Sequence, residues 1–445
     1  MLEVLNTLLW GPGTLTLILG AGAWLTLRTG GFPQRNLGRA LALSLGREAR
    51  RKGQGGVSPF GSLMTALAST VGTGNIVGVA AALVSGGPGA LVWMELAALL
   101  GLAAKFAECM LAVKYHRVRQ DGTRWGGPMA VMETRLGPAG AVLGRFYALF
   151  ALLMAFTMGA LAQSGALADT FAAAFALPRY KVGLATAVLA LIILLGGVRS
   201  IAGTSTMLVP VMALLYIGGG LAVILGNGDR LPEAMALMVR CAFAPEAALG
   251  GALGIVTRRE ALRWGVARSV FSNEAGLGSA AITAACADTD EPVKQGLISM
   301  TGVFFDTMVI CTVTGLAICC SGTLGTADGA GRPLTGAALT LRAFETVLGP
   351  LAPWLIGVAL GLFAFTSVLG CAVQAETTAS YLLGPGAVRP CRVLYGLAVF
   401  AGAVIPMATV LQLADLANAL MAFPNLVCLL LLSGEIAGEC GRKER

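Results

Sequence analysis

The chain has 445 residues, of which 56% are hydrophobic and only 12% are charged, and its mean hydropathy is +0.79. Soluble domains carry about 25% charged residues, and a helix needs about 20 apolar residues to cross a bilayer. The composition therefore excludes a soluble protein and predicts an all-α polytopic membrane protein. The net charge of +8 does not indicate a nucleic-acid partner, because most of the excess lies in two loops between apolar segments.

Apolar runs recur along the whole chain and predict about eleven transmembrane helices. The first lacks the basic flank and cleavage site of a signal peptide, so we interpret it as a retained span. The expected spans, with bounds accurate to a few residues, are 10–27, 58–84, 89–113, 145–176, 182–197, 204–226, 248–287 (broken, with a polar lead-in), 295–320, 352–384, 391–409 and 411–432.

Basic residues predict the orientation of these spans in the cell membrane. The loops Arg28–Val57 and Lys114–Arg145 hold seven and six Lys or Arg residues. Cytoplasmic loops are enriched in these residues, so we expect the N-terminus outside and the C-terminus in the cytoplasm. One cluster of arginines fits this topology poorly, because it falls on the nominally outer half of the chain's spans. Either these arginines line an aqueous vestibule, or the predicted span boundary there is displaced. The members of the cluster are Arg258, Arg259, Arg263 and Arg268.

Two apolar segments contain residues that disfavour a continuous helix. In the first, Gly72, Thr73, Gly74 and Asn75 follow one another; Gly costs about 1 kcal/mol relative to Ala in a helix interior. The second interruption is the run S-N-E-A-G-L-G-S at Ser272–Ser279. Broken helices at membrane depth are tolerated where they are buried or line a cavity, and a pair in corresponding halves indicates a transporter binding site.

The spacing of the interruptions predicts a repeat. Without the first span, the remaining ten spans form two groups of five, and each group begins with a broken helix. Because five is an odd number of crossings, the second group has the opposite orientation in the membrane. We expect an extra helix and basic loop over 1–57, the first repeat over 58–227, the inverted repeat over 228–432 and a cytoplasmic tail over 433–445. The long outer loop Thr323–Gly349 holds a weak amphipathic pattern near Leu339–Leu348, which suggests a lid.

Enzyme chemistry has little support in this sequence. His116 is the single histidine, and no metalloprotease, nucleotide-binding or serine-hydrolase motif occurs. None of the ten cysteines forms a C-x-x-C pattern with a histidine partner, so neither a zinc site nor a disulfide framework is indicated. We therefore expect no enzyme activity and no cofactor apart from a coupling ion.

Ionisable residues inside spans are costly and are candidate functional groups. Glu274, in the second break, either caps freed amides or serves as a coupling-ion or proton site. Lys105 and Glu108 are three residues apart and are expected to pair on one helix face. Asp306 and Glu376 are further coupling or structural candidates, and we expect Gln163 to line a pocket or bridge helices.

Thr366 and Ser367 are adjacent in an apolar run and permit two interpretations. Hydroxyls in helices commonly bond to carbonyls one turn earlier. Alternatively, the two hydroxyls coordinate Na⁺ with carbonyls freed at the first break, because hard cations prefer oxygen ligands.

The motifs of this chain resemble those of the alanine or glycine:cation symporters, the sodium:alanine symporter family. The resemblance covers nearly the whole chain in order, and it implies a LeuT-type inverted-repeat fold and cation-coupled uptake of small amino acids. The matching runs are T-A-L-A-S-T-V-G-T-G-N-I-V-G-V-A, G-G-P-G-A-L-V-W-M-E, K-F-A-E, G-G-P-M, L-V-P-V-M-A-L-L-Y, V-F-S-N-E-A-G-L-G-S-A, P-V-K-Q-G and V-F-F-D-T.

The resemblance also implies roles for individual residues. Thr73, Gly74 and Asn75 would contact the substrate carboxylate, and Gln163 would project into the pocket from the third core helix. The substrate ammonium or side chain would meet Phe271, Ser272 and Asn273. The implied Na⁺ ligands are the carbonyls of Ala68 and Val71 with Thr366 and Ser367. Cys371 stands where the family usually has Trp, which would enlarge the pocket wall and suit a larger neutral amino acid.

Together these features predict Na⁺-coupled symport of a small neutral amino acid by alternating access. The partners would be that amino acid and the lipid bilayer, with the chain either a monomer or an oligomer of undetermined size. H⁺ coupling through Glu274 or Glu376 is the first alternative. A channel or a transport-dead sensor on the same fold is the second, because broken helices also build selectivity filters.

Overall fold

Helices form most of the structure, a computed structural model that describes residues 9–51, 57–119, 122–244, 246–250, 254–327, 329 and 331–444. Lipid offers no hydrogen-bond partner, so a helix is the way an apolar segment satisfies its own backbone in a membrane. Six described helical stretches are apolar and long enough to cross a bilayer, and a bent pair adds a seventh. The all-α membrane class is confirmed. Three other expected spans are helices of 17, 17 and 15 residues, so the count of eleven stays a prediction.

The first part of the chain ends in the first interrupted helix. It comprises α2 (Pro12–Arg28), α3 (Phe32–Arg35), α4 (Leu37–Leu45), the 3-10 helix η1 (Glu48–Arg50), α5 (Pro59–Thr70), the π-helix η2 (Gly74–Gly78) and α6 (Val79–Gly86). Ser58 caps α5 by accepting a hydrogen bond from the Gly61 N–H at 3.0 Å. The segment bends by 53° between Thr70 and Gly74, which confirms the predicted break.

The next part carries a small antiparallel hairpin between long helices. It comprises α7 (Gly89–Lys114), β1 (Arg117–Val118), β2 (Arg124–Trp125), α8 (Pro128–Arg135), α9 (Gly137–Met154), the π-helix η3 (Ala155–Ala162), α10 (Gln163–Phe175), α11 (Arg179–Leu195), α12 (Gly197–Gly226), η4 (Gly228–Arg230) and α13 (Leu231–Phe243). Helices α9 and α12 each begin about two turns before the expected 145 and 204. Pro138 favours the earlier start of α9, because its fixed φ suits a first turn.

The C-terminal half begins with a second hairpin. It comprises β3 (Glu246–Gly250), β4 (Gly254–Thr257), α14 (Arg258–Asn273), α15 (Ser279–Ala284), α16 (Pro292–Val303), the π-helix η6 (Phe304–Cys311), α17 (Thr312–Cys320), α18 (Gly336–Leu348), η7 (Gly349–Leu351), α19 (Ala352–Leu383), η8 (Pro385–Ala387), α20 (Val388–Gly402), α21 (Met407–Leu431) and α22 (Ser433–Glu444). A helical start at 248 is therefore wrong. Thr257 and Glu260 form a capping box that sets the start of α14 at Arg258.

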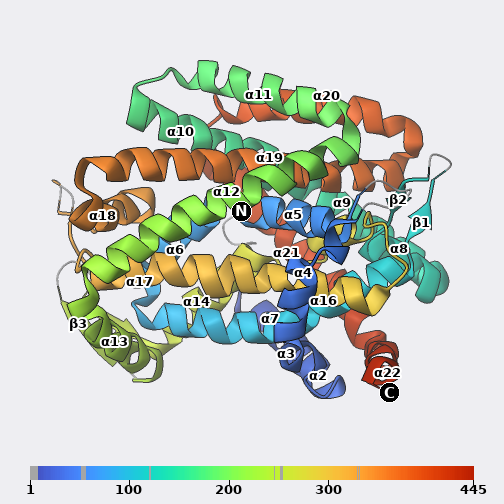
Figure 1. The fold of residues 1–445 in the computed structure, drawn as a ribbon, viewed down its shortest axis with the longest axis horizontal. Helices are drawn as coiled ribbons and strands as arrows, with labels where there is room; N and C mark the ends of the chain where they lie inside the picture. The colour runs from blue at the N-terminus through green and yellow to red at the C-terminus, as the bar shows by residue number, and fades with distance from the viewer. Residues whose placement is uncertain are drawn as a thin grey trace.

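The long helices lie side by side, and the connections gather at two opposite ends (Figure 1). The hairpin β1–β2 and α8 lie at one end, together with the C-terminal helix α22. Helices α13 and α18 and strand β3 lie at the other end. The β1–β2 end carries residues of Lys114–Arg145, one of the two loops predicted to be cytoplasmic.

Helix α19 runs through the middle and packs against α5, α10 and α12. It is buried along almost its whole length from Ala352 to Ser380. Helix α18 forms where an amphipathic helix was predicted, and its buried face holds Leu339 and Phe344. Thr340 Oγ1 donates to the Ile76 carbonyl at 3.3 Å, so α18 rests directly on the first break. Its role as a lid stays a prediction.

Candidate functional site

The backbone leaves helical geometry between Thr70 and Gly74. Val71 has a ψ of 90°, and its N–H makes the last α-helical bond, to the Leu67 carbonyl at 2.7 Å. Within the described part of the chain, the N–H groups of Thr73 and Gly74 make no backbone hydrogen bond. Freed donors at the start of a half-helix are suited to an anionic group.

Asn75 connects the first break to two other helices. Its Nδ2 donates to Asp306 Oδ1 at 2.7 Å and to Ser272 Oγ at 3.0 Å, while its Oδ1 accepts from the Gly72 N–H at 3.1 Å. Ser272 Oγ in turn donates to Asp306 Oδ2 at 2.6 Å. Asn75, Ser272 and Asp306 are at most 1% exposed. The structure thus brings together two expected substrate contacts and a carboxylate that the sequence left without a partner.

The second break lies between the end of α14 at Asn273 and the start of α15 at Ser279, as predicted. Glu274 adopts a left-handed conformation with φ of 53°, and Gly276 and Gly278 also have positive φ, which glycine adopts readily. Asn273 Oδ1 accepts from the Ala275 N–H at 2.9 Å. The Glu274 carboxylate accepts a hydrogen bond from the hydroxyl of Ser279.

A carboxylate of α7 caps this second break. Glu108 Oε2 accepts from the Gly278 N–H at 3.1 Å and from Asn425 Nδ2 at 3.1 Å. Asn425 also donates to the Gly276 carbonyl at 2.9 Å. Lys105 Nζ lies 3.7 Å from Glu108 Oε1, which confirms the predicted pair. Capping of freed amides was one of the two roles expected for Glu274, but at Gly278 this role belongs to Glu108. The only sequence signal for Glu108 was its spacing from Lys105.

Ser367 is the hydroxyl of α19 that reaches the first break. Its Oγ lies 3.4 Å from the Val71 carbonyl and also donates to the Phe363 carbonyl at 2.9 Å. A Cβ on Gly72 would lie 2.8 Å from Ser367 Oγ. One turn of backbone therefore presents a freed carbonyl beside a buried hydroxyl, which is a suitable arrangement for a hard cation.

The other expected Na⁺ ligands are close to the same contact. Thr366 Oγ1 donates to the Leu362 carbonyl at 2.9 Å and lies 3.2 Å from Met212 Sδ of α12. A Cβ on Gly370 would lie 2.9 Å from the carbonyl carbon of Ala68, so α19 abuts the end of α5. Both hydroxyls bond one turn back, as the first interpretation predicted, and Ser367 alone of the two contacts Val71.

Gln163 and Phe271 have different neighbours near the first break. Thr73 Oγ1 donates to Gln163 Oε1 at 3.3 Å, and Gln163 is 4% exposed. The ring of Phe271 lies against Trp10, with centroids 4.4 Å apart and the two planes tilted by 35°. Gln163 thus faces the freed backbone, whereas the Phe271 ring lies toward the segment that precedes α2.

Cys371 packs away from the break. A Cβ on Gly159 would lie 2.3 Å from Cys371 Cβ and 2.8 Å from the Tyr395 hydroxyl. These residues belong to the contact of α19 with η3 and α20, where Cys371 is 2% exposed. This packing favours a structural role, and a place for Cys371 in the pocket wall stays a prediction.

The chain matches the sodium:alanine symporter family over residues 1–441. It belongs to that family. The chain is 40% identical to the sodium/alanine symporter AgcS of Methanococcus maripaludis, covering 99% of this chain and 96% of AgcS. It is 37% identical to the probable sodium/glutamine symporter GlnT of Bacillus subtilis, covering 97% and 87% of the two chains.

The fold of this sodium:alanine symporter family member is similar to that of MhsT, solved in complex with L-phenylalanine. The TM-score is 0.58 at 16% identity, covering 86% of this chain and 90% of MhsT. This likeness confirms a LeuT-type fold. The family membership makes the chain a multi-pass membrane transporter and not an enzyme, with Na⁺-coupled amino-acid symport as the family's activity.

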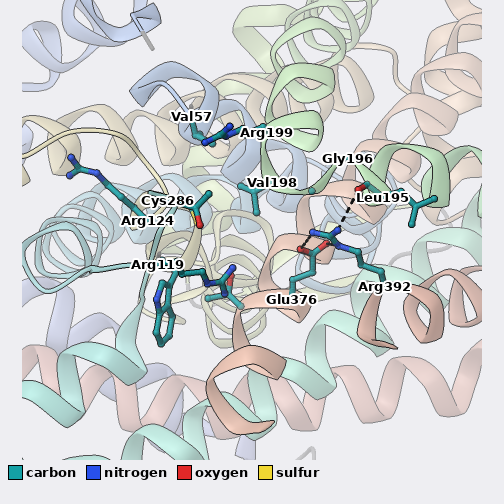
Figure 2. A pocket seen from close by; sticks show the side chains of 14 residues that line it. Val57, Arg119, Arg124, Leu195, Gly196, Val198, Arg199, Cys286, Glu376 and Arg392 are labelled. Carbon is teal, nitrogen blue, oxygen red and sulfur yellow. Dashed lines mark hydrogen bonds and ion pairs between the residues drawn. The ribbon is translucent and has the colours of Figure 1, made fainter. Parts of the chain in front are cut away.

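In this family member, a cavity of about 300 Å³ opens at the hairpin end (Figure 2). Its wall combines the β1–β2 hairpin, the start of α12, the residue Cys286 after α15, and side chains of α19 and α20. Arg392 points toward Glu376 and binds both carboxylate oxygens at 2.8 Å. Glu376 therefore has a fixed cationic partner, which favours a structural role over proton carriage.

The hairpin is tied to the segment that follows α15. Arg124 Nη1 donates to the Thr289 carbonyl and to Asp290 Oδ1, each at 2.7 Å, and Nη2 lies 3.2 Å from Asp288 Oδ1. The Asp288 N–H donates to the Val57 carbonyl at 2.9 Å. The hairpin, the α15 end and the start of α5 are therefore joined at this end of the molecule.

Proposed function

We propose that this family member imports a small neutral amino acid together with Na⁺ by alternating access. The observation that carries the proposal is the freed pair of amides at Thr73 and Gly74, which lies among buried polar side chains of other helices. Gln163, from α10, is one of these neighbours, and Asn75 ties the same turn to α14 and η6. A dipolar solute and its ion would satisfy groups that lipid cannot.

The amino acid would place its carboxylate on the free amides of Thr73 and Gly74, in contact with Asn75. Gln163, Phe271, Ser272 and Asn273 would surround its ammonium and side chain. The names of the relatives support either alanine or a larger neutral substrate such as glutamine. Cys371 in place of a family Trp is in line with the larger class.

Na⁺ would bind between α5 and α19, through the carbonyls of Ala68 and Val71 and the hydroxyls of Thr366 and Ser367. Four neutral oxygens make an exchangeable site, as a coupling ion requires. A bound ion favours the occluded state only through contacts that are better in that state. The chain bends by 53° between α5 and the segment Gly74–Gly86. A change in this angle would change the contacts of the bound ion.

The repeats at 58–227 and 228–432 would move against each other around this site, with residues 1–57 and 433–445 outside the repeats. The N-terminus would lie outside and the C-terminus in the cytoplasm. Helix α18 would close the outer side above η2. The β1–β2 hairpin, with its Arg124 contacts, would close the inner side.

The test is uptake of labelled alanine and glutamine by proteoliposomes, with a panel of twenty unlabelled amino acids as competitors. We expect uptake to collapse when choline replaces Na⁺. Uptake that persists in choline with a proton gradient would support H⁺ coupling through Glu274 or Glu376 instead. Absence of saturable counterflow would favour a channel, and binding without uptake would favour a sensor.

A further inference from the structure

Arg268 of α14 lies directly on the first break. A Cβ on Gly74 would come within 2.4 Å of Arg268 Nη2, and a Cβ on Gly78 within 2.1 Å of Nη1. These separations are far below van der Waals contact, so the guanidinium occupies the space that side chains at 74 and 78 would fill. The two glycines therefore allow a cation from the second repeat to rest against the turn whose amides are free.

This guanidinium lacks an acceptor. Its Nε is buried and unbonded, and within the described part of the chain Arg268 forms no hydrogen bond or ion pair. The ring of Phe271 lies near the guanidinium, with 5.9 Å between Arg268 Cζ and the ring centroid. Arg268 is half-buried and its Nε is removed from solvent, and withdrawing a charged group from water without a partner is costly. A guanidinium in this position is suited to binding an anion.

The nearby carboxylates do not complete it. Asp306 already accepts hydrogen bonds from Asn75, Ser272 and Thr307. Asp415 of α21 is close enough to influence Arg268 electrostatically, but forms no ion pair with it. The guanidinium instead lies against Gly74, whose N–H makes no backbone hydrogen bond within the described residues.

We propose that Arg268 is a specificity-determining residue that binds the carboxylate of the amino-acid substrate together with the amides of Thr73 and Gly74. The inference rests on the proposed function, because transport supplies the missing anion. Arginine suits this task, since its planar fork matches a carboxylate. The remaining members of the arginine cluster differ: Arg258, Arg259 and Arg263 are exposed, which separates Arg268 from them.

The test measures Na⁺-dependent uptake of labelled alanine in the presence of two competitors, L-alanine and L-alaninamide, which lacks the carboxylate. If the parent prefers glutamine, labelled glutamine is the substrate, and glutamine and its α-amide are the competitors. We expect Arg268→Gln to weaken competition by the free amino acid about tenfold to hundredfold, as loss of a charge-assisted hydrogen bond implies. Competition by the amide should change less than twofold. Arg268→Lys should restore part of the discrimination because it keeps the charge.

Two further variants separate recognition from folding. Gly78→Ala leaves Arg268 in the chain but places a methyl group in the guanidinium's position, so it should reproduce the loss of discrimination. Arg263→Gln, on the exposed side of the same helix, and Gly302→Ala, whose Cβ would have no neighbour nearer than 3.8 Å, should match the parent.

The inference is overturned if Arg268→Gln and Gly78→Ala keep the parent's ratio of amino-acid to amide competition, or if both ligands weaken equally. If the parent itself shows no Na⁺-dependent uptake of alanine or glutamine, the proposed function fails first. An active parent with unchanged discrimination in the variants removes Arg268 from recognition and leaves the proposed function intact.

Discussion

The carboxylate of Glu108 lies 3.1 Å from the backbone N–H of Gly278, so a side chain of α7 caps the second interrupted helix. The same carboxylate balances Lys105, which is 2% exposed. One residue thus caps a freed amide and supplies the ion-pair partner, at 3.7 Å, of a buried cation.

Glu108→Gln should therefore destabilise the protein. The substitution leaves Lys105 as an unpaired buried cation, and removing one partner of such a pair costs about 3–5 kcal/mol. The measurement is the thermal unfolding midpoint of the detergent-solubilised protein, which we expect to fall. The double variant Lys105→Met with Glu108→Gln should recover part of that loss, because neither residue then leaves an unpaired charge. A single variant as stable as the parent would show that the pair contributes nothing.

Ser367→Ala should raise the Na⁺ concentration that half-saturates uptake. The substitution removes the hydroxyl that lies 3.4 Å from the Val71 carbonyl, and a neutral contact is worth about 0.5–1.5 kcal/mol, or about twofold to tenfold. Thr378→Ala is the matched control, since Thr378 also bonds one turn back on α19, to Gln374, at 2.7 Å. Equal shifts in the two variants would place the Na⁺ site elsewhere.

Glu376→Gln should open the cavity at the hairpin end. The variant weakens the two 2.8 Å contacts to Arg392 and leaves α19 and α20 less firmly joined. We expect faster labelling of Cys286, which lines the cavity, by a membrane-impermeant thiol reagent, read by peptide mass spectrometry. Glu133→Gln breaks the half-exposed pair with Arg117 at the same end and should label at the parent's rate. Unchanged labelling in Glu376→Gln would argue against a closing role for the ion pair.

The docking of α22 should weaken in acid. Burial alone would raise the pKa of Glu435, but hydrogen bonds from Lys114 and Tyr115 outweigh it and hold the pKa below its ordinary value. A lowered pKa means that the carboxylate stabilises the docked helix above its ordinary pKa of about 4.3, and that this stabilisation is lost as pH falls through the lower, folded pKa. Arg135 adds a contact at 3.1 Å.

Hydrogen exchange of α22, corrected for the intrinsic pH dependence, measures this effect. We expect protection at about pH 7 to fall near about pH 3 in the parent. Glu435→Gln should remove most of the protection at both pH values, whereas Glu345→Gln at the opposite end should behave like the parent. Protection that does not depend on pH in the parent would refute the linkage.

Local features of the sequence predicted a large part of this molecule. The runs at Gly72–Asn75 and Ser272–Ser279 break their helices in the structure, because glycine and asparagine act on the backbone where they stand. The Lys105–Glu108 pair and the amphipathic helix before Gly349 formed for the same reason, since both depend on neighbours within one or two turns. The β3–β4 hairpin was missed because its apolar residues were assigned to the start of the broken span 248–287.

By itself the sequence determined that the chain crosses a membrane as helices and where two of them are interrupted, since apolar length and backbone-breaking residues act locally. Only the tertiary structure decided which side chains complete the interruptions: Asp306 on Asn75, 231 positions away, Glu108 on Gly278, 170 positions away, and Arg268 on Gly74. Those contacts depend on which helix faces meet, and that choice is made by the packing of the whole bundle rather than by any single segment.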